Sequence, residues 1–434
     1  MRVIFLLALI ALAACARDDE SDAPLNVVTI TIEASAVGPW RATYELTEGA
    51  RRLDFGPSRD HYRETWWRVE GNGVRLVTEN GRDFVISADG KTPFRNFSVS
   101  ITPAASARAK SYEPFIGLGA GGQLFYTGHF IPYQERFTRM ATHLTVAAPE
   151  GAAVTGFGET KPAFTDWESP YRNPAFLYVG KVAPKKSASM ELIVDDAAPL
   201  WIDEEISEFA PKIAATLAKL LGRDLLTTPD IFLAMGDVSE EGRVAYSGDA
   251  LPGQYQMTLA GGGWLAENDF ARRLLRRSTA HEAAHLWQAA VRPRSDAVPD
   301  WIHEGGASAL AREALIEAGY WTADDAAADL QRARAECASG LAGASLDRAE
   351  AAHDWPTVYA CGEIANIAAA GDQGSAAFWR EFMSRAASGA GYDEAMFVDL
   401  ARERGGGAAA DAIRELSRIN NADAGPVIDR MLAR

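Results

Sequence analysis

One short motif restricts the fold of this chain more than any other feature. Residues 281–285 read His-Glu-Ala-Ala-His, and Glu304 follows after eighteen intervening residues. Side chains four residues apart lie on one face of a helix, so His281 and His285 can bind the same metal ion. Glu282, one step further round, would face a bound water, and Glu304 on a second helix would be the third ligand. Three protein ligands leave one position of a tetrahedral zinc open, which is typical of a catalytic site.

The residues around the motif favour two helices joined by a short connector. Asn268 is a suitable N-cap, apolar residues follow at helical spacing, and neither Gly nor Pro occurs before Pro293. Asp300 is a second suitable N-cap, and residues 301–318 are predicted to form a helix with Glu304 in its first turn. The alternative is that two histidines and a glutamate lie on solvated helical faces and bind no metal.

The motif, its spacing to Glu304 and the Trp-Ile-His-Glu-Gly sequence at residues 301–305 resemble those of the gluzincin metallopeptidases. The resemblance is to the aminopeptidase N-like and glycyl aminopeptidase-like branches. It implies a thermolysin-like catalytic domain that hydrolyses peptide bonds with one Zn²⁺. It assigns His281, His285 and Glu304 as the zinc ligands, and Glu282 as the general base that takes a proton from water.

These families also carry a catalytic tyrosine in a Tyr-x-Lys-Gly sequence. Residues 359–362 here read Tyr-Ala-Cys-Gly, with a cysteine where the families have lysine. The resemblance implies that Tyr359 donates a hydrogen bond to the developing oxyanion. The alternative is an ordinary core tyrosine on a helix at about residues 355–370, with Tyr255 or Tyr320 in the catalytic role.

One departure from the family pattern concerns the substrate's amine. The aminopeptidase N-like branch has a Gly-x-Met-Glu-Asn strand before the first histidine, and the glutamate of that strand binds the amine. The corresponding segment here, residues 256–263, contains no glutamate, and the next one is Glu267. Gly261, Gly262 and Gly263 are predicted to present backbone groups to an extended peptide, with a flexible loop as the alternative. Strict aminopeptidase activity is therefore in doubt, whereas hydrolysis of peptide bonds is expected.

The start of the chain indicates its location. Residues 1–14 have the charged start, short apolar core and small-residue end of a secretory signal peptide, too short to span a membrane. The Leu-Ala-Ala-Cys ending at Cys15 resembles a bacterial lipobox. This resemblance implies lipid attachment at Cys15 in the outer membrane, facing the periplasm, with residues 15–24 as a flexible tether. The alternative is an ordinary signal peptide cut beside a chance cysteine.

The two remaining cysteines, Cys337 and Cys361, are predicted to form a disulfide. An oxidising compartment permits the bond, and an even count favours it. A bridge closing this loop would stabilise the fold by about 3 kcal/mol and would hold the backbone close to Tyr359. Two buried thiols are the alternative.

The character of the sequence changes near Pro199. Residues 25–198 alternate apolar with polar residues between Asn-Gly and Asp-Gly turns, which predicts an antiparallel β-domain. Residues 199–370 are predicted to form the catalytic domain, with a candidate edge strand at residues 255–259, and residues 371–434 a C-terminal helical region. The expected fold class is α+β and multidomain: an N-terminal antiparallel β-domain followed by a mainly helical, thermolysin-like zinc metallopeptidase domain.

The other histidines are not expected to take part in the site. His61, His129 and His143 show no metal-ligand spacing and are interpreted as structural or surface residues. His303 is interpreted as an exposed helix residue rather than a partner of a ligand, because adjacent helical residues point apart.

The formal net charge of −16 argues against nucleic acid as a partner, because such binding needs a basic face. We therefore expect a lipid-anchored peptidase of the cell envelope that acts on a peptide or protein substrate. Two alternatives remain: a degenerate gluzincin that holds zinc without turnover, and an envelope binding or scaffold protein. The intact Glu282 argues against degeneration, because a zinc scaffold needs no general base. The natural substrate, the choice between exopeptidase and endopeptidase, and the oligomeric state stay open at this point.

Overall fold

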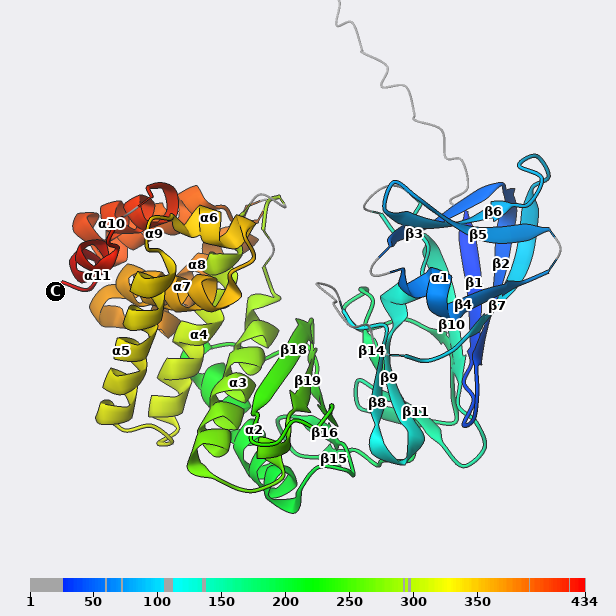
Figure 1. Cartoon of the computed structure of the whole chain (residues 1–434), viewed down its shortest axis with the longest axis horizontal. Helices are drawn as coiled ribbons and strands as arrows, with labels where there is room; N and C mark the ends of the chain where they lie inside the picture. The colour runs from blue at the N-terminus through cyan, green and yellow to red at the C-terminus, as the bar shows by residue number, and fades with distance from the viewer. Residues whose placement is uncertain are drawn as a thin grey trace, which may run out of the picture.

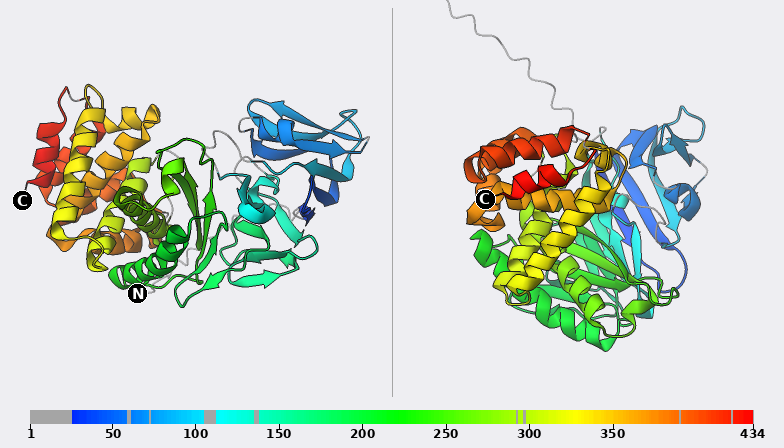
Figure 2. Two further views of the ribbon diagram at one scale, coloured as in Figure 1. Left: turned by 60° about the horizontal axis from the view of Figure 1, so that its bottom comes forward. Right: turned by 60° about the vertical axis from the view of Figure 1, so that its left-hand side comes forward.

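The computed structural model describes residues 26–58, 61–71, 73–104, 112–134, 138–291, 293–295, 298–389, 391–420 and 422–433 (Figure 1). Cys15, the predicted signal peptide and the predicted tether lie outside these residues. In the described ranges, no helix is both long and apolar enough to cross a membrane. Sheets make up the N-terminal domain and helices the C-terminal part, with a mixed sheet between them (Figures 1 and 2). The predicted α+β class is confirmed.

Three sheets form the N-terminal domain. The six-stranded sheet contains, in spatial order, β13 (Ala163–Trp167), β10 (Ala141–Ala147), β1 (Val27–Glu33), β2 (Trp40–Ala50), β7 (Phe94–Ile101) and β4 (Trp67–Glu70). The five-stranded sheet contains β12 (Glu159–Lys161), β11 (Ala153–Gly156), β14 (Phe176–Gly180), β9 (Gly122–Tyr126) and β8 (Phe115–Leu118). The three-stranded sheet contains β3 (Arg52–Pro57), β6 (Arg82–Ser87) and β5 (Val74–Glu79), and a short helix α1 (Tyr62–Trp66) precedes β4.

The strand β1 shows what alternation in the sequence can and cannot predict. Val28, Ile30 and Ile32 are fully buried, and the residues between them are only partly buried, as the pattern requires. β1 pairs antiparallel with β2 but parallel with β10. The prediction of a wholly antiparallel domain is wrong at this pair, because a half-buried strand alternates in the same way whatever the direction of its neighbour.

A fourth, mixed sheet lies between the N-terminal sheets and the helices (Figure 1). Its strands, in spatial order, are β15 (Lys185–Lys186), β16 (Glu191–Val194), β17 (Asp230–Met235), β19 (Gln254–Ala260) and β18 (Ala245–Leu251). Because β15 and β16 precede residue 198, this sheet begins within the segment predicted as β-domain. β19 is an inner strand, paired with β17 on one side and β18 on the other. The predicted edge strand at residues 255–259 is therefore wrong, and β18 is the described edge.

Buried polar side chains join the two domains beside the mixed sheet. Gln254 accepts a hydrogen bond from the backbone nitrogen of Phe176 on β14 and donates one to its carbonyl, each at 2.9 Å. Asp195 accepts hydrogen bonds from the backbone nitrogens of Gly119 at 2.7 Å and Met235 at 2.9 Å. An apolar cluster containing residues of both domains is buried around them. These contacts place the β-domain against one side of the mixed sheet.

Helices cover the other side of the mixed sheet and form the C-terminal part. They are α2 (Leu200–Leu221), α3 (Asp269–Gln288), α4 (Asp300–Glu317), α5 (Ala323–Gly340), α6 (Leu346–Ala351), α7 (Trp355–Ala370), α8 (Ser375–Ala387), α9 (Glu394–Arg404), α10 (Gly407–Arg418) and α11 (Gly425–Leu432). The two helices predicted around the motif are confirmed as α3 and α4. The prediction of Asp300 as N-cap is wrong, because Pro299 takes the N-cap position and Asp300 is the first helical residue.

The C-terminal helices share their core with the motif helices. Trp301 on α4 packs edge-on against Phe397 on α9, with ring centroids 5.2 Å apart. Trp379 on α8 donates a hydrogen bond to Asn366 on α7 at 3.0 Å. One apolar cluster extends from the mixed sheet to α11. Residues 371–434 therefore complete the core behind the motif.

Candidate metal centre and active site

Helix α3 holds the predicted motif on adjacent turns. The side chain of Asn268 caps the helix by accepting a hydrogen bond from the backbone nitrogen of Ala271 at 2.9 Å. All residues from 278 to 288 are buried. His281 and His285 are therefore presented from a rigid, packed segment rather than from a solvated helical face.

Glu304, the fifth residue of α4, meets both histidines. Its Oε2 lies 3.2 Å from Nε2 of His281 and 3.3 Å from Nε2 of His285, and the two imidazole nitrogens are 3.1 Å apart. The ligand atoms of the three residues all lie within 4.8 Å of one another. Two imidazole nitrogens and one carboxylate oxygen are a donor set that suits zinc. The structure thus brings together the three residues that the sequence predicts as ligands.

The surroundings of His281 and Glu304 prepare these two side chains for a cation. Burial lowers the pKa of His281 to about 4, so its imidazole is neutral and can coordinate. Nδ1 of His281 lies 3.1 Å from Oγ of Ser308, which directs Nε2 toward Glu304. Burial alone would raise the pKa of Glu304. The charge of His285 and the hydrogen bonds with both histidines outweigh burial and hold this pKa well below its ordinary value. Ser308 was not predicted, although it follows Glu304 by four residues and so shares its helical face.

His303 lies against the metal centre, not in solvent. Its ring stacks on that of His285, with centroids 4.7 Å apart and an interplanar angle of 18°. Its Nδ1 is buried and has no hydrogen-bond partner among the described residues. The interpretation of His303 as an exposed residue is wrong, because α3 packs so closely along α4 that His303 and Glu304 both reach His285.

Glu282 projects from α3 toward the edge strand β18. It is only 6% exposed, and burial raises its pKa to about 8. An ideal Cβ on Gly248 of β18 would lie 2.6 Å from Oε1 of Glu282, so only a glycine leaves room for this carboxylate. A carboxylate with a pKa near neutrality can both accept and return a proton.

Tyr359, near the start of α7, faces the same site. Its ring centroid lies 5.7 Å from that of His281, and the side chain is 38% exposed. Burial, followed by the charges of Glu304 and Glu282, raises its pKa far above 10. Tyr359 is therefore not a core tyrosine, and its hydroxyl is protonated and able to donate a hydrogen bond.

Two glycines set the distance between the helices that carry Glu304 and Tyr359. An ideal Cβ on Gly305 of α4 would lie 2.1 Å from the carbonyl carbon of Gly362 on α7. One on Gly362 would lie 2.5 Å from the carbonyl oxygen of Trp301. The two backbones therefore touch directly, which brings Tyr359, one turn before Gly362, next to the metal ligands.

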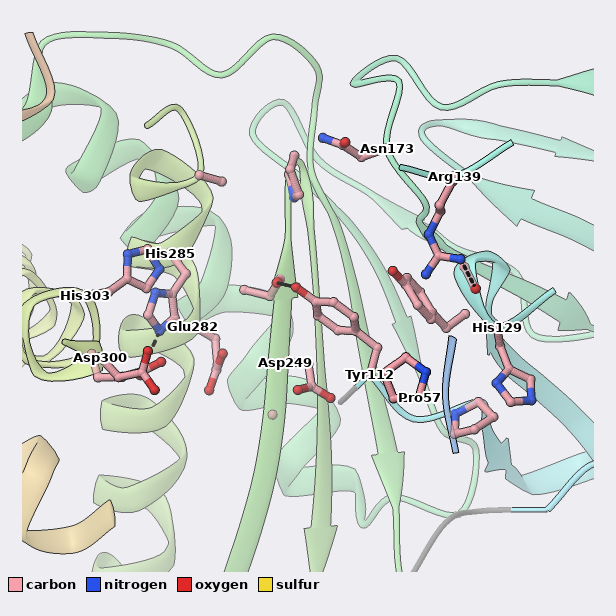
Figure 3. Close-up of a pocket in the computed structure, with 18 of the residues that line it drawn as sticks. Pro57, Tyr112, His129, Arg139, Asn173, Asp249, Glu282, His285, Asp300 and His303 are labelled. Atoms are coloured by element: carbon pink, nitrogen blue, oxygen red, sulfur yellow. Dashed lines mark hydrogen bonds and ion pairs between the residues drawn. The ribbon is translucent and has the colours of Figure 1, made fainter. Parts of the chain in front are cut away.

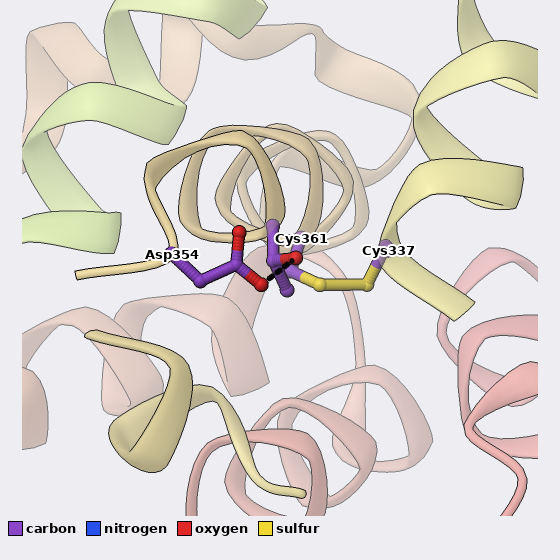
Figure 4. The surroundings of a disulfide bond; sticks show 4 residues. Cys337, Asp354 and Cys361 are labelled. Carbon is purple, nitrogen blue, oxygen red and sulfur yellow. Dashed lines mark hydrogen bonds between the residues drawn. A yellow bond between two sulfur atoms is a disulfide. The ribbon is translucent and has the colours of Figure 1, made fainter. Parts of the chain in front are cut away.

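A disulfide and a buried ion-pair network tie α7 to its neighbours. Cys337 on α5 and Cys361 on α7 form a disulfide (Figure 4). Glu363 on α7 accepts a hydrogen bond from Arg277 on α3 at 2.8 Å, and Arg277 also lies 3.2 Å from Asp329 on α5. Both carboxylates are buried. Helices α3, α5 and α7 are therefore linked within one turn of Tyr359 and His281.

A cavity of about 920 Å³ lies between the two domains in front of the metal centre (Figure 3). The side of the candidate metal centre contributes Gly248, Asp249, Ala250, Pro252, Glu282, His285, Ala289, Asp300, His303, Glu304, Trp355 and Tyr359. The β-domain contributes Phe55, Pro57, Tyr62, Arg63, Tyr112, Pro114, Tyr126, Gly128, His129, Tyr133, Arg139 and Asn173. The cavity is of the size that proteins use for small-molecule and short-peptide ligands. Its lining includes His129, which the sequence predicts to be a structural or surface residue.

The predicted glycine site is not part of this lining. Gly261, Gly262 and Gly263 follow β19 and pack against the backbone of the segment 238–243, where added Cβ atoms would lie 2.3–3.0 Å from carbonyl oxygens and other atoms. The prediction that they bind substrate is not supported, because they serve the close approach of two backbone segments. The edge strand β18 lies beside the metal centre instead, and it presents Asp249.

Asp249 supplies a carboxylate that the sequence analysis did not find. One of its oxygens accepts a hydrogen bond from Nε2 of Gln256 at 2.9 Å. Burial raises its pKa to about 6, and Glu304 contributes in the same direction. The sequence places the family's strand at residues 256–263, shortly before the motif helix. The strand beside the metal centre is instead β18, which precedes β19 in the same hairpin. Only the pairing of β18 with β19 identifies it.

No protein-family model matches the chain, and neither does a curated protein. Solved structures do match. An aminopeptidase N family protein from Idiomarina loihiensis is similar with a TM-score of 0.67 at 12% identity, over 91% of this chain and 76% of that one. An M1 zinc metallopeptidase from Deinococcus radiodurans, solved as a mutant bound to a Tyr-Ser-Ala substrate, has a TM-score of 0.52 at 16% identity, over 91% and 94%.

Yeast LTA4 hydrolase in complex with bestatin is also similar, with a TM-score of 0.52 at 13% identity, over 87% of this chain and 64% of that one. At such identities the likeness concerns the fold. The arrangement of N-terminal sheets followed by a helical part is the one these structures share. The described chain therefore has the architecture of the M1 zinc metallopeptidases.

Proposed function

We propose that this protein is a zinc-dependent peptidase. The observation that carries the proposal is the convergence of His281, His285 and Glu304 beside a cavity that His285, Glu304 and Glu282 line. The donors fit zinc in number and kind, and they leave a position for water. A protein that only stored zinc would not need a buried carboxylate facing the cavity next to the ligands.

The residues divide the chemistry of peptide hydrolysis among them. Zinc, when bound, supplies Lewis-acid polarisation of the substrate carbonyl and activation of a water. Glu282 takes the proton from the attacking water and returns it to the leaving amine nitrogen. Tyr359 donates a hydrogen bond to the carbonyl oxygen as negative charge develops on it.

Asp249 favours an exopeptidase. It lies on the edge strand, where an extended peptide can add its backbone, and its carboxylate lines the cavity between Glu282 and the β-domain. We infer that Asp249 binds the free amine of the substrate. Asp249→Asn should therefore lower kcat/KM for peptides with a free amine much more than for their N-acetylated forms. An equal loss for both substrates would exclude this role.

Zinc content and hydrolysis of a peptide mixture, followed by mass spectrometry, test the proposal. Glu282→Gln should keep the metal and lose about 10²- to 10⁴-fold in rate, because a general base is removed and no ligand is. Glu304→Ala should lose zinc on dialysis, because one of three protein ligands is gone. Glu336→Gln, on the exposed face of α5, is the matched control and should behave as wild type. A Glu282→Gln variant with full activity, or without zinc, would refute the assignment.

We propose that the protein is anchored to the outer membrane through a lipid on Cys15, facing the periplasm. The support is the lipobox-like sequence that ends at this cysteine. Cys15→Ser should release the protein in soluble form or leave the precursor uncut. Metabolic labelling with a fatty acid that failed to mark the wild-type protein would rule the anchor out.

A further inference from the structure

Across the cavity from the metal centre, the β-domain presents one oriented guanidinium. Nη1 of Arg139 donates hydrogen bonds to the carbonyl oxygens of Gly128 and Ile131, each at 2.6 Å. The guanidinium carbon lies 4.4 Å from the centroid of the Tyr133 ring. A guanidinium has five N–H donors, so these two bonds hold the group and leave the others for further acceptors.

The charge of Arg139 is not neutralised by a neighbouring carboxylate in the part of the chain that the structure describes. Two other arginines lie nearby, and each has its own acid. Arg63 pairs with Asp83 at 3.1 Å, and Arg82 pairs with Asp54 at 2.8 Å. Arg139 is thus the excess positive charge on this wall, in a protein whose formal net charge is −16.

The opposite wall is acidic. Glu282, Asp300 and Glu304 line the cavity at the metal centre, and Asp249 lies between them and the β-domain (Figure 3). Figure 3 also shows Arg139 and Asn173 on the far side of the cavity from His285 and Glu282. A ligand that fills this cavity therefore meets negative side chains at one end and a fixed guanidinium at the other.

Aromatic side chains connect the two ends. The rings of Tyr112 and Tyr126 lie 4.8 Å apart, and both side chains line the cavity together with Arg139. The hydroxyl of Tyr112 donates a hydrogen bond to the carbonyl oxygen of Ala250 on β18 at 3.5 Å, so this ring reaches the strand beside the metal centre. The wall between the charged ends can therefore pack side chains of a ligand that spans the cavity.

We propose that Arg139 binds the C-terminal carboxylate of a short peptide whose scissile bond lies at the metal centre. The inference rests on the proposed peptidase function and adds the class of substrate: peptides short enough to have both termini inside the cavity. A planar guanidinium is suited to a carboxylate because it can donate two parallel hydrogen bonds to it. Longer chains would place an uncharged peptide group at Arg139.

The test compares three peptides that are identical at the scissile bond. One has a free C-terminal carboxylate, the second a C-terminal amide, and the third a C-terminal amide with glutamate as its last residue. For the wild-type protein, kcat/KM for the free acid should exceed that for the amide by about 10- to 100-fold, as charge-assisted hydrogen bonds allow. A ladder of free-acid peptides of increasing length should show a maximum at one length.

Arg139→Ala should bring the ratio of free acid to amide close to one, and Arg139→Lys should keep part of it because the charge remains. A structural role for Arg139 would instead lower both rates alike and leave the ratio unchanged, which would overturn the proposal. A wild-type ratio near one would also overturn it. The third peptide has only the side-chain carboxylate of its last residue. If its kcat/KM equals that of the free acid, Arg139 binds an acidic side chain, and the C-terminal assignment is refuted.

Binding separates this proposal from the proposed function. Calorimetry with zinc-loaded Glu282→Gln measures affinity for the free acid and the amide without any turnover. If no peptide is hydrolysed by the wild type, the peptidase function fails, and the same affinity ratio still decides the role of Arg139. Equal affinities for the free acid and the amide would sink the carboxylate anchor.

Discussion

Gly248 is the position at which one methyl group should separate catalysis from metal binding. In Gly248→Ala, the new Cβ would lie 2.6 Å from Oε1 and 2.8 Å from Cδ of Glu282. Ordinary contact begins at 3.4 Å, so the carboxylate has to withdraw by the difference, 0.8 Å. The third close atom is the carbonyl oxygen of Gln256, at 3.1 Å. Because the two closest atoms are the end of a flexible side chain and the backbone oxygen is only 0.3 Å short of ordinary contact, folding should cost little.

The same shift should be costly for the reaction. A displacement of about 1 Å in a catalytic group can cost about 10²-fold in rate. Complete removal of a general base costs about 10²- to 10⁴-fold, which is the upper limit for an effect that acts through Glu282. We therefore expect kcat of Gly248→Ala to fall by about 10²-fold. Zinc content should stay at the wild-type level, since none of the three crowded atoms belongs to a ligand.

The assay measures zinc by metal analysis and kcat on one peptide. Ser247→Ala, at the exposed neighbouring position of β18, is the matched control and should keep the wild-type kcat. The double variant Gly248→Ala/Glu282→Gln should be no slower than Glu282→Gln alone, because both changes act on the same carboxylate. Wild-type kcat in Gly248→Ala, or additive losses in the double variant, would refute the reasoning.

Three further predictions concern the tyrosine, the helix crossing and the disulfide. Tyr359→Phe should lower kcat by about 10²- to 10³-fold at unchanged zinc content, because one hydrogen bond to the oxyanion is lost. Wild-type kcat would exclude that role. Gly305→Ala should lower both the thermal midpoint and the zinc content, because overpacking against Gly362 costs about 1–3 kcal/mol and moves α4. A variant as stable as wild type would contradict a tight crossing. Replacing Cys337 and Cys361 with alanine should remove about 3 kcal/mol of unfolding free energy in chemical denaturation, and an unchanged midpoint would count against this estimate.

Much of the metal centre could be predicted because its signals are local. The spacing of His281 and His285 places both on one face of any helix. Asn268 caps the first helix, and Asp300 is the first residue of the second. Ser308 follows the same rule, because it lies one turn beyond Glu304. The period of the helix determines which face these residues share, independently of the rest of the chain.

Other parts of the site could not be predicted because they depend on which segments meet. Asp249 was missed since strand order, which makes β18 the edge, depends on pairing between distant segments. His303 was misassigned because its contact with His285 depends on how closely α3 approaches α4. Gly261 was taken for a substrate contact, although its neighbour is the backbone of the loop before β18.

The sequence by itself predicted the three candidate ligands, the glutamate beside them, the two motif helices and the α+β class, because each is encoded in short-range periodicity and residue chemistry. Tertiary structure alone decided the parallel pairing of β1 with β10, the edge strand at the site and the contact of Gly305 with Gly362. It also placed Arg139, from the β-domain, on the wall of a cavity whose other side holds Glu304. Such juxtapositions arise from packing between residues far apart in the chain, for which no local pattern exists.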